Sequence, residues 1–381
     1  MNLEELFSFN LCTRCTGRIF AGIGTGLTNK ERGESLLFAY NALIGSMQEK
    51  TSCYICNGIF DQFDKYLKIV LDRLSGYEYN SFLVGSKFDP EILERENQIQ
   101  EKFGKKGESI KKEFNREFGK YMENITGKTY SKDPDIIINI NTIYDYVEIN
   151  VKSLYIYGVY TKMRRDLPQT RWIHGSGDSI ESIIGEELKK ITESENYYLH
   201  GSGREDVDVM MLGNGREFVI EASNPKKRSV NLEEFKFAVN SKNAGIKIDK
   251  LSFCDKKRVK EIKEAKHDKV YRAVIESDGI MDREKLIRAC ELLTGNKIEQ
   301  QTPRRVLGNR SDIIRKKEIK YIKIEDIMDK TATIQICAEA GTYIKELVNG
   351  DCGRTNPSLT SLYGEKLRVK SLDVIYINRG D

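Results

Sequence analysis

Two matched cysteine pairs constrain the fold of this chain more than any other feature. The first pair, Cys12 and Cys15, lies in CTRCTGRIF, and the second, Cys53 and Cys56, lies in CYICNGIF. Both follow the pattern Cys-x-x-Cys-x-Gly, with an Ile-Phe step close behind. A Cys-x-x-Cys turn brings two thiolates within reach of one tetrahedral ion. The sequence therefore predicts a four-thiolate zinc site that joins two distant segments.

The spacing between the two pairs leaves the zinc site open to alternatives. The 37 residues between them exceed the spacing of ~15–20 found in compact zinc ribbons. Two unrelated thiol pairs, or a redox pair, are the alternatives. Four protein ligands would leave no open position for a substrate, so the zinc site would be structural. Gly17 and Gly58 are expected to take positive φ, which would point backbone N–H groups at the sulfurs.

Composition and charge exclude several classes of protein. The chain has 381 residues, enough for two to three domains. Its 62 basic and 58 acidic residues give a net charge of only +4, so a nucleic-acid site requires local clustering. No apolar stretch approaches ~18 residues and the N-terminus has no basic-then-apolar signal, so we expect no membrane span and no secretory leader. Eight cysteines are too few for a disulfide scaffold, which favours a reducing, cytoplasmic compartment.

The pattern of apolar residues predicts an α+β fold. Helices are expected at 28–50, from Asp61 to Gly76, at 90–124 with an interruption at 104–107, and at 179–193, 231–244 and 282–295. Strands are expected at 77–85, 136–140, 144–151, 153–160, 246–254, 268–277, 318–325, 331–339 and 366–377. The segment 162–172 is basic and is interpreted as a linker. Asn-Gly in LGNG at 212–215 predicts a hairpin turn, and short connections favour a mostly antiparallel sheet after residue 170.

The densest polar cluster is HGSGREDVDVMMLGNGREF at 200–218. If 204–209 is extended, Arg204, Asp206 and Asp208 share one face. An arginine beside an aspartate favours the ionised carboxylate, which can act as a nucleophile or a base. The spacing does not choose between Asp206 and Asp208, and a surface ion pair beside a hairpin would give the same pattern.

Two more polar segments carry candidate site residues. QTPRRVLGNRSDIIR at 301–315 has the arginine density of a loop that contacts phosphate, with Arg304 and Arg305 at its start. In AEAGTYIKELVNGDCGRTNPSL at 338–359 a strand ends at Gly341 and a helix follows. The N-terminal end of a helix suits an anion, and Lys345 lies there. An exposed helix lysine is the alternative interpretation.

Taken together, these segments resemble the Pus10 family of tRNA pseudouridine synthases. The resemblance rests on 203–228, 301–312 and 340–359, which occur in the family's order, and on the two cysteine pairs. The stretch SLYIYGVYTKMRRDLPQT at 153–170 is similar to the end of a THUMP domain, an RNA-binding module. The resemblance implies a zinc-binding region at 1–60, a THUMP-like domain at 61–170 and a pseudouridine synthase domain at 171–381.

The resemblance also assigns roles to individual residues. The family's Arg-x-Asp step falls on Arg204-Glu205-Asp206, which implies that Asp206 is the nucleophile and Arg204 its ion-pair partner and a wedge beside the flipped base. The active-site tyrosine falls on Tyr271. The Gly-Thr-Tyr-Ile-Lys motif implies that Tyr343 contacts the substrate, that Lys345 pairs with the nucleophile and that Leu347 is an apolar wall. Arg304 and Arg305 are expected to bind the substrate as well.

The implied reaction converts uridine to pseudouridine at positions 54 and/or 55 of the tRNA T-loop. It is an isomerisation, so no organic cofactor is expected beside the structural zinc. The target base must leave its stack, and the N-terminal region would dock the acceptor stem. A monomer is the default expectation. The alternative is a catalytically inactive, zinc-containing tRNA-binding protein. A THUMP-linked methyl- or sulfur-transferase would need a glycine-rich strand–helix motif that the sequence lacks.

Three departures from the family's pattern concern RNA binding. The segment at 173–182 is shorter than the insert found in many relatives. Met210 occupies the position after the second valine, where relatives often have an arginine. Gly308-Asn309 replaces the usual His-Arg step.

Overall fold

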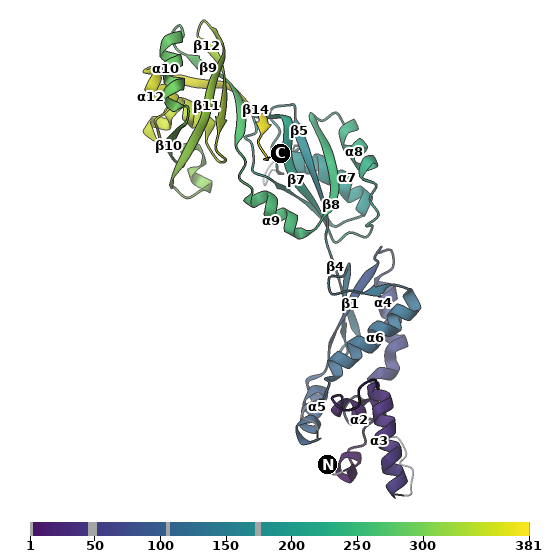
Figure 1. Ribbon diagram of the computed structural model, residues 1–381. Helices are drawn as coiled ribbons and strands as arrows, with labels where there is room; N and C mark the ends of the chain where they lie inside the picture. The colour runs from purple at the N-terminus through teal and green to yellow at the C-terminus, as the bar shows by residue number, and fades with distance from the viewer. Residues whose placement is uncertain (1–2, 45–51, 104–106, 172–176, 381) are drawn as a thin grey trace. The chain divides into compact units, whose positions relative to one another are not determined.

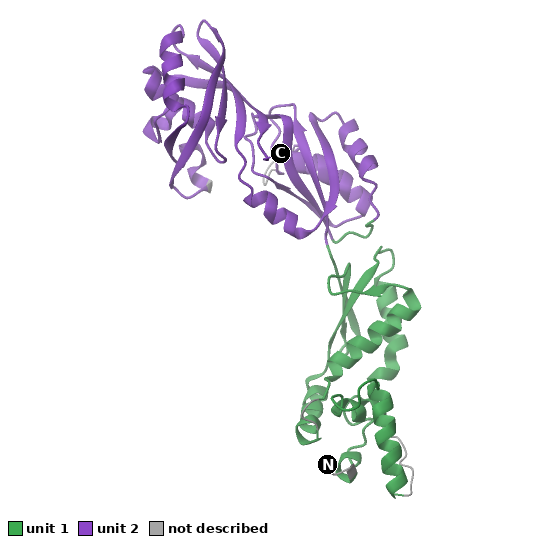
Figure 2. Ribbon diagram, in the orientation of Figure 1, with its two compact units in different colours: residues 1–152, 224–228 green, residues 153–223, 229–381 purple. Residues whose placement is uncertain are grey.

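The computed structural model describes residues 3–44, 52–103, 107–171 and 177–380. The end of the helix expected at 28–50, most of the interruption at 104–107 and the start of the segment at 173–182 lie outside these residues. The chain forms two compact units (Figure 2). Unit 1 comprises residues 1–152 and 224–228, and unit 2 comprises 153–223 and 229–381.

Unit 1 is built from helices packed on a small sheet (Figure 1). Its sheet order is β2-β1-β3-β4, with β1 parallel to both of its neighbours and β3 antiparallel to β4. The elements are α1 (Leu3–Phe7), α2 (Thr13–Ile19), α3 (Asn29–Ile44), η1 (Ile59–Gln62), α4 (Phe63–Arg73), β1 (Ser81–Lys87), α5 (Pro90–Phe103), α6 (Ile110–Thr126), β2 (Thr129–Tyr130), β3 (Ile136–Asn141) and β4 (Tyr146–Val151). Alternate residues of β1 and β3 point inward, so Phe82 and Ile138 are fully buried together with Phe114 and Phe118 of α6.

Helices α2 and α3 meet through two glycines. A Cβ added to Gly33 would lie 1.8 Å from the carbonyl oxygen of Thr13, and one added to Gly17 would lie 1.8 Å from that of Asn29. Gly17 is part of α2, so the expectation of positive φ at this residue is wrong. Gly58 does take it, with φ 72°. The first glycine therefore serves close helix packing rather than a left-handed turn.

Unit 2 contains one large sheet with the order β13-β10-β11-β12-β9-β14-β7-β5-β8, and β6 pairs with β7. Only β7 and β14 are parallel among its described strand pairs, which confirms a mostly antiparallel sheet. The first elements are β5 (Leu154–Lys162), α7 (Ile180–Thr192), β6 (Asn196–Gly201), β7 (Met210–Ser223), α8 (Leu232–Ser241), β8 (Ile246–Cys254), α9 (Lys256–Glu264) and β9 (Lys269–Ser277). Then follow α10 (Arg283–Leu293), β10 (Asn296–Gln301), η2 (Arg304–Asn309), β11 (Ile314–Met328), β12 (Thr331–Ala338), α11 (Ile344–Asn349), η3 (Gly350–Gly353), β13 (Thr355–Asn356), α12 (Leu359–Tyr363) and β14 (Leu367–Ile377).

The hairpin expected at 212–215 is wrong, because these residues lie inside β7. Gly213 and Gly215 take φ of 62° and 67°. A Cβ on the first would meet a carbonyl of β14 at 1.9 Å, and a Cβ on the second would meet one of β5 at 2.6 Å. Between them, Asn214 exchanges side-chain hydrogen bonds with the backbone of Ile377, at 2.7 and 2.9 Å. The glycines therefore allow an irregular strand to pass closely between two neighbours.

The structure divides the chain at 152/153, whereas the resemblance placed the boundary at 170/171. Strand β5 is paired on both edges, with β7 and β8, and most of its side chains are buried. A strand enclosed in this way belongs to the sheet that covers it. The segment expected to end a THUMP-like domain and the basic linker after it are thus part of unit 2. Residues 1–60 are likewise not separate, since Ile19 and Phe60 share one core with Phe114.

We predict that Gly33→Ala destabilises unit 1. Overpacking of this kind costs ~1–3 kcal/mol, which lowers the melting temperature of a unit this size by about 2–4 °C per kcal/mol. Differential scanning calorimetry of the full chain measures the change. Gly119→Ala in α6 is the matched control, because a Cβ there has no neighbour within 4 Å. Equal effects of the two substitutions would contradict a packing role for Gly33.

Candidate active site and metal centre

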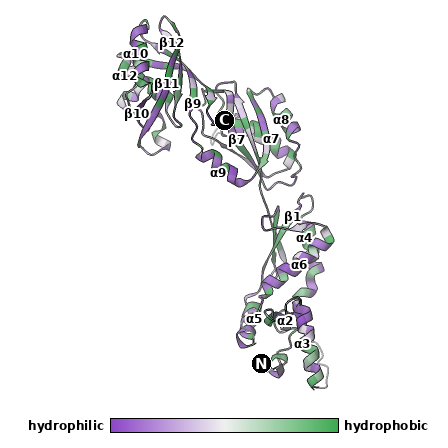
Figure 3. Ribbon diagram, in the orientation of Figure 1, coloured by the Kyte–Doolittle hydropathy of each residue, from purple (hydrophilic) through white to green (hydrophobic). Residues whose placement is uncertain are grey.

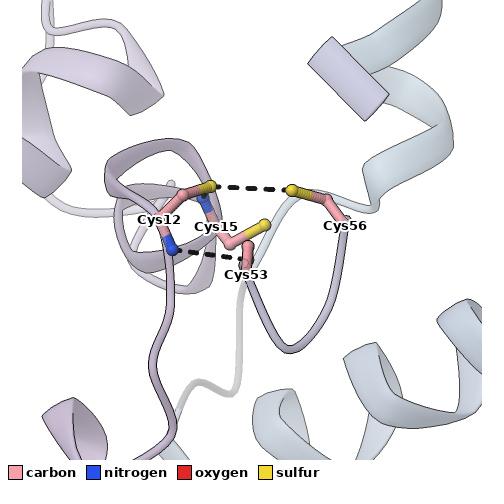
Figure 4. Close-up of side chains that lie close together, drawn as sticks. All are labelled: Cys12, Cys15, Cys53 and Cys56. Carbon is pink, nitrogen blue, oxygen red and sulfur yellow. Dashed lines mark hydrogen bonds between the residues drawn. The ribbon is translucent and has the colours of Figure 1, made fainter. Parts of the chain in front are cut away.

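The four predicted ligand cysteines lie together in unit 1 (Figure 4). All four sulfurs are within 4.8 Å of one another, and the Cys12 and Cys56 sulfurs are 3.7 Å apart. Sulfurs bound to one tetrahedral Zn²⁺ at ~2.3 Å would be separated by about 3.8 Å. The backbone N–H of Cys12 donates to the Cys53 sulfur at 3.3 Å, and that of Cys15 donates to the Cys12 sulfur at 3.4 Å. This group of cysteines can hold a metal ion.

Arg18 connects the cysteines to two other helices. Its guanidinium is buried and donates Nη2 to the Cys15 sulfur at 3.5 Å. The same group donates Nε to Glu96 of α5 at 2.9 Å and Nη1 to Glu113 of α6 at 3.1 Å. A buried guanidinium requires partners for its donors, and Arg18 has two carboxylates and one sulfur. The packing of α5 and α6 is therefore coupled to the cysteine cluster.

In unit 2 the segment between β6 and β7 borders a cavity of about 440 Å³. Arg204 and Asp206 line it from this loop, and Tyr271, Arg305 and Lys345 line it from other elements. The loop is not extended as expected, because the Val209 N–H donates to the Asp206 carbonyl at 3.0 Å and closes a turn. The sequence-predicted catalytic residues thus surround one space.

Asp206 is held by two cations at the edge of this cavity. Arg305 Nη1 lies 3.1 Å from its carboxylate, and Lys345 Nζ lies 3.3 Å from Oδ2. Arg204 was expected to be the ion-pair partner, but it is exposed and makes no ion pair with Asp206 among the described residues. The arginine that pairs with Asp206 comes instead from η2. Arg305 is itself fixed by a 2.7 Å bond from Nε to Glu346.

Asp208 contacts the same lysine but does not line the cavity. Lys345 Nζ lies 2.8 Å from both of its carboxylate oxygens. Partial burial raises the pKa of Asp208, but the hydrogen bonds and charge of Lys345 outweigh this and hold the pKa below its usual value. The structure therefore separates two aspartates that the sequence spacing left equivalent, because only Asp206 borders the cavity.

Tyr271 and Lys269 line the cavity from alternate positions of β9. Burial raises the pKa of Tyr271 to about 12, with Asp206 adding to the shift and Arg216 opposing it. Tyr271 is accordingly a neutral phenol at physiological pH. Burial, together with the charge of Arg216, lowers the pKa of Lys269 to about 8. A cation of lowered pKa thus lies beside the tyrosine.

Three other predicted residues take different places. Tyr343 lines the cavity and accepts a 2.9 Å hydrogen bond from Arg310 at its hydroxyl. Arg304 is exposed outside the cavity lining, and its backbone N–H donates to Asp351 at 3.0 Å. Leu347, expected as an apolar wall, is fully buried in the core and does not line the cavity.

The apolar part of the lining comes from Val209, Val306, Ile344, Leu372 and Val374. Sequence reasoning did not identify these residues. The alternation of Leu372 and Val374 within the strand predicted at 366–377 was the available signal, but it does not distinguish a cavity wall from a core.

A buried polar network fixes the loop that carries Asp206. Glu205 turns inward and pairs with Arg216 of β7 at 2.8 Å, with each side chain only 2% exposed. Glu205 also accepts from the hydroxyl of Tyr160 at 2.8 Å. Gln169 donates to the same hydroxyl at 2.9 Å and to the carbonyl of Gly203 at 3.1 Å. The backbone on the N-terminal side of Asp206 is therefore anchored to the core.

Lys162, at the end of β5, anchors the other side of Asp206. It is fully buried and donates Nζ to the carbonyl of Val207 at 2.8 Å and to that of Asp206 at 3.4 Å. Burial lowers the pKa of Lys162 below its usual value. Sequence reasoning missed Lys162, Tyr160 and Gln169 because it placed them in or beside the RNA-binding domain.

Comparison with known proteins identifies the family of this chain. The family model described as "Pus10, C-terminal" matches residues 155–378, and the model "Pus10 THUMP domain, archaeal" matches 66–141. A protein of Picrophilus torridus called tRNA pseudouridine synthase Pus10 is 56% identical over the full length of both chains. One of the same name from Thermoplasma acidophilum is 50% identical over 100% of this chain and 99% of its own. The Pyrococcus furiosus relative is 37% identical over 98% and 96%.

Among solved structures, one described as "Crystal Structure of a Cbf5-Nop10-Gar1 Complex" covers 58% of this chain and 48% of its own, at 16% identity and a TM-score of 0.34. That likeness is too weak to carry an argument.

The matches and the site define the class as a pseudouridine synthase with an attached THUMP domain. The chain belongs to the Pus10 family. The evidence is not limited to separate motifs, because a relative with this name is 56% identical along the whole length of the chain. No helix among the described residues is long and apolar enough to cross a membrane.

We predict that Glu205→Gln strongly destabilises unit 2. Removing one partner of a buried ion pair leaves Arg216 uncompensated, at a cost of about 3–5 kcal/mol. Urea unfolding of the full chain measures the loss. Glu299→Gln is the control, because Glu299 is 57% exposed in its pair with Lys316, and exposed pairs contribute ~0–1 kcal/mol. If both variants lost the same free energy of unfolding, burial of the Glu205 pair would not add to its contribution to stability.

Proposed function

We propose that this protein isomerises uridine to pseudouridine in the T-loop of tRNA, at position 54, 55 or both, with Asp206 as the nucleophile. The observation that carries the proposal is the placement of Asp206 beside Tyr271 at one cavity, between the cations of Arg305 and Lys345. An oriented carboxylate with paired cations is suited to covalent attack. A cavity of about 440 Å³ is of the size that takes a small ligand or an extruded nucleotide.

The reaction rearranges bonds within one nucleoside. The bond between N1 of uracil and C1′ of ribose breaks, C5 bonds to C1′, and the proton leaves C5 while N1 gains one. Asp206 attacks either C1′ or C6, and it is released at the end because the net change is an isomerisation. No organic cofactor has a role in this scheme, since no electrons are gained or lost.

The residues around Asp206 have distinct roles in this proposal. Arg305 and Lys345 hold the carboxylate charged and aimed into the cavity. Tyr271, as a neutral phenol, stacks on the extruded base, a contact worth ~1–3 kcal/mol by analogy with single-strand binding proteins. Lys269, with a pKa of about 8, lies on the same face of β9 as the tyrosine. Tyr271 would help to remove the C5 proton, and the neutral fraction of Lys269, which grows as the pH approaches 8, would accept it.

The family and the basic loop support tRNA as the substrate. The relatives carry the name tRNA pseudouridine synthase, and the archaeal THUMP model covers part of unit 1. Arg304 and Arg310 are exposed near the cavity and would contact phosphates, with Arg204 as a wedge beside the flipped base. Unit 1 would dock the acceptor stem. We propose that the protein acts as a monomer and that it is located in the cytoplasm.

We also propose that the four cysteines bind a structural zinc ion. The donor set of four thiolates suits Zn²⁺, and four protein ligands close the site to substrate. The ion would hold α2 to the loop at 53–56, and the N–H groups of Cys12 and Cys15 support the sulfurs.

Replacing the nucleophile tests the activity. We expect Asp206→Ala to abolish pseudouridine formation while tRNA affinity changes little, because the carboxylate acts in the chemical step. Carbodiimide modification and primer stops on an unmodified transcript measure the product. Asp208→Ala should keep measurable activity, since Asp208 does not border the cavity. Product from the Asp206 variant would refute the assignment, and tRNA binding by the wild type without product would favour a catalytically inactive binding protein.

Removing two cysteines tests the metal. We expect the double variant Cys12→Ser, Cys53→Ser to lose bound zinc, because each pair then retains one thiolate. Metal content is measured by mass spectrometry after purification. Cys254→Ser with Cys352→Ser is the control, as neither residue belongs to the cluster. Unchanged zinc in the first variant would exclude this site.

A further inference from the structure

The segment 247–269 concentrates positive charge in unit 2, and apart from Lys269 its residues do not line the cavity that holds Asp206. It contains nine basic and five acidic residues, a net charge of +4, which equals the net charge of the whole chain. The segment forms most of β8, all of α9 and the start of β9. The helix ribbon is largely hydrophilic in Figure 3. A charge of this density creates a local positive potential that attracts anionic partners.

Four of the five acidic residues of this segment are already engaged. Asp249 pairs with Lys236, Glu261 with Arg258 and Glu264 with Lys260. Asp255 caps the first turn of α9 by accepting from two backbone N–H groups. Six exposed lysines have no ion pair within the part of the chain that the structure describes: Lys247, Lys250, Lys256, Lys257, Lys263 and Lys266. Their charge is therefore available to a partner.

Helix α9 covers its own face of the sheet. Ile262 of α9 packs with Tyr155 and Val219, whereas the neighbouring residues Ile156 and Ile220 point into the main core, with α7 and α8. Because side chains of a strand alternate between faces, α9 lies on the face opposite those two helices. The exposed lysines of α9 therefore lie on the side of the sheet opposite α7 and α8.

A second cavity lies between α9 and this face of the sheet. Its volume is about 450 Å³, and its charged lining consists of Lys250, Arg258, His267 and Arg379 together with Glu217 and Glu261. Glu217 accepts hydrogen bonds from Tyr157 at 2.8 Å and from Arg258 at 3.2 Å, so its charge is compensated. Arg379 is 11% exposed, its Nε lies 3.7 Å from Glu217, and its Nη2 donates to the carbonyl groups of Asn214 and Gly215. Both guanidinium groups of the lining are therefore engaged within the protein, and the unpaired positive charge of this region is on the lysines.

One feature favours RNA as the partner. The segment leads into β9, because His267 lines the second cavity while Lys269 and Tyr271 line the one that holds Asp206. An RNA that delivers a base to Tyr271 would pass near this segment.

We propose that α9 and the lysines beside it form a second docking surface for the RNA backbone, which binds the phosphates of the tRNA whose base enters the cavity at Asp206. This inference rests on the proposed function for the identity of the RNA. The surface contributes affinity and position rather than chemistry, as phosphate contacts do.

The test compares three variants of the full-length protein. In the first, Lys256, Lys257, Lys263 and Lys266 are changed to Gln, and in the second the same four are changed to Arg. The third changes four other exposed lysines of unit 2 to Gln, namely Lys285, Lys297, Lys366 and Lys370. Each binds an unmodified tRNA transcript in a fluorescence anisotropy titration at several salt concentrations. Circular dichroism melts establish that all three are folded.

The Gln variant of the α9 surface should bind at least about 10-fold more weakly at ~200 mM salt, with the salt slope reduced by about 2–4, since each phosphate contact contributes about 0.7–0.9. The Arg variant and the Gln variant at the other lysines should bind nearly as the wild type does. At saturating tRNA the rate of product formation should stay within about 2-fold, because only ground-state binding is lost.

Unchanged affinity of the α9 Gln variant, or an equal loss in the variant at the other lysines, would overturn the proposal. A footprint on the tRNA that does not change in the α9 variant would also overturn it and point to an acidic protein as the partner. Because the readout is binding, its result is independent of catalysis. If the wild type binds tRNA but forms no pseudouridine, the proposed function fails while the surface is still tested.

Discussion

The buried ion pair between Glu205 and Arg216 determines how the candidate site is arranged. A carboxylate and a guanidinium this far from water must stay together, because separating them leaves an uncompensated charge in the core. The pair draws Glu205 inward, and the turn that follows leaves Asp206 at the cavity. Lys162 then holds the carbonyl groups of Asp206 and Val207. The proposed nucleophile is thus positioned by its backbone, and its carboxylate remains available to cations and substrate.

The cations at the cavity have divided tasks. Arg305 joins Asp206 to Glu346, and Lys345 joins Asp206 to Asp208, so each cation is shared between two carboxylates. Because each cation contacts two carboxylates, the side chains are restrained, and no single cation neutralises the charge of Asp206 completely. In unit 1 the buried Arg18 plays a comparable part, since it ties the cysteine cluster to Glu96 and Glu113. Both sites are therefore fixed by arginines that bridge separate elements.

Much of the local structure followed from the sequence alone. The helices expected at 231–244 and 282–295 are present as α8 and α10, and the strands at 246–254 and 331–339 are present as β8 and β12. The cysteine spacing predicted one four-thiolate cluster, and the four sulfurs do lie together. These features depend on residues close in sequence or on a repeated pattern. The prediction of a hairpin at 212–215 was wrong. Asn-Gly favours a turn locally, but packing between β5 and β14 keeps the segment in a strand.

The sequence by itself determined the family resemblance, the mixed α+β class and the set of candidate residues Asp206, Tyr271 and Lys345. Only the tertiary structure decided that Arg305 rather than Arg204 pairs with Asp206, and that Leu372 rather than Leu347 lines the cavity. It also placed β5 in the large sheet of unit 2, whereas the resemblance had assigned it to the THUMP-like region. The physical reason is that ion pairs, cavity walls and strand pairing join residues far apart in the chain. The distances between such residues in space cannot be read from their spacing along the sequence.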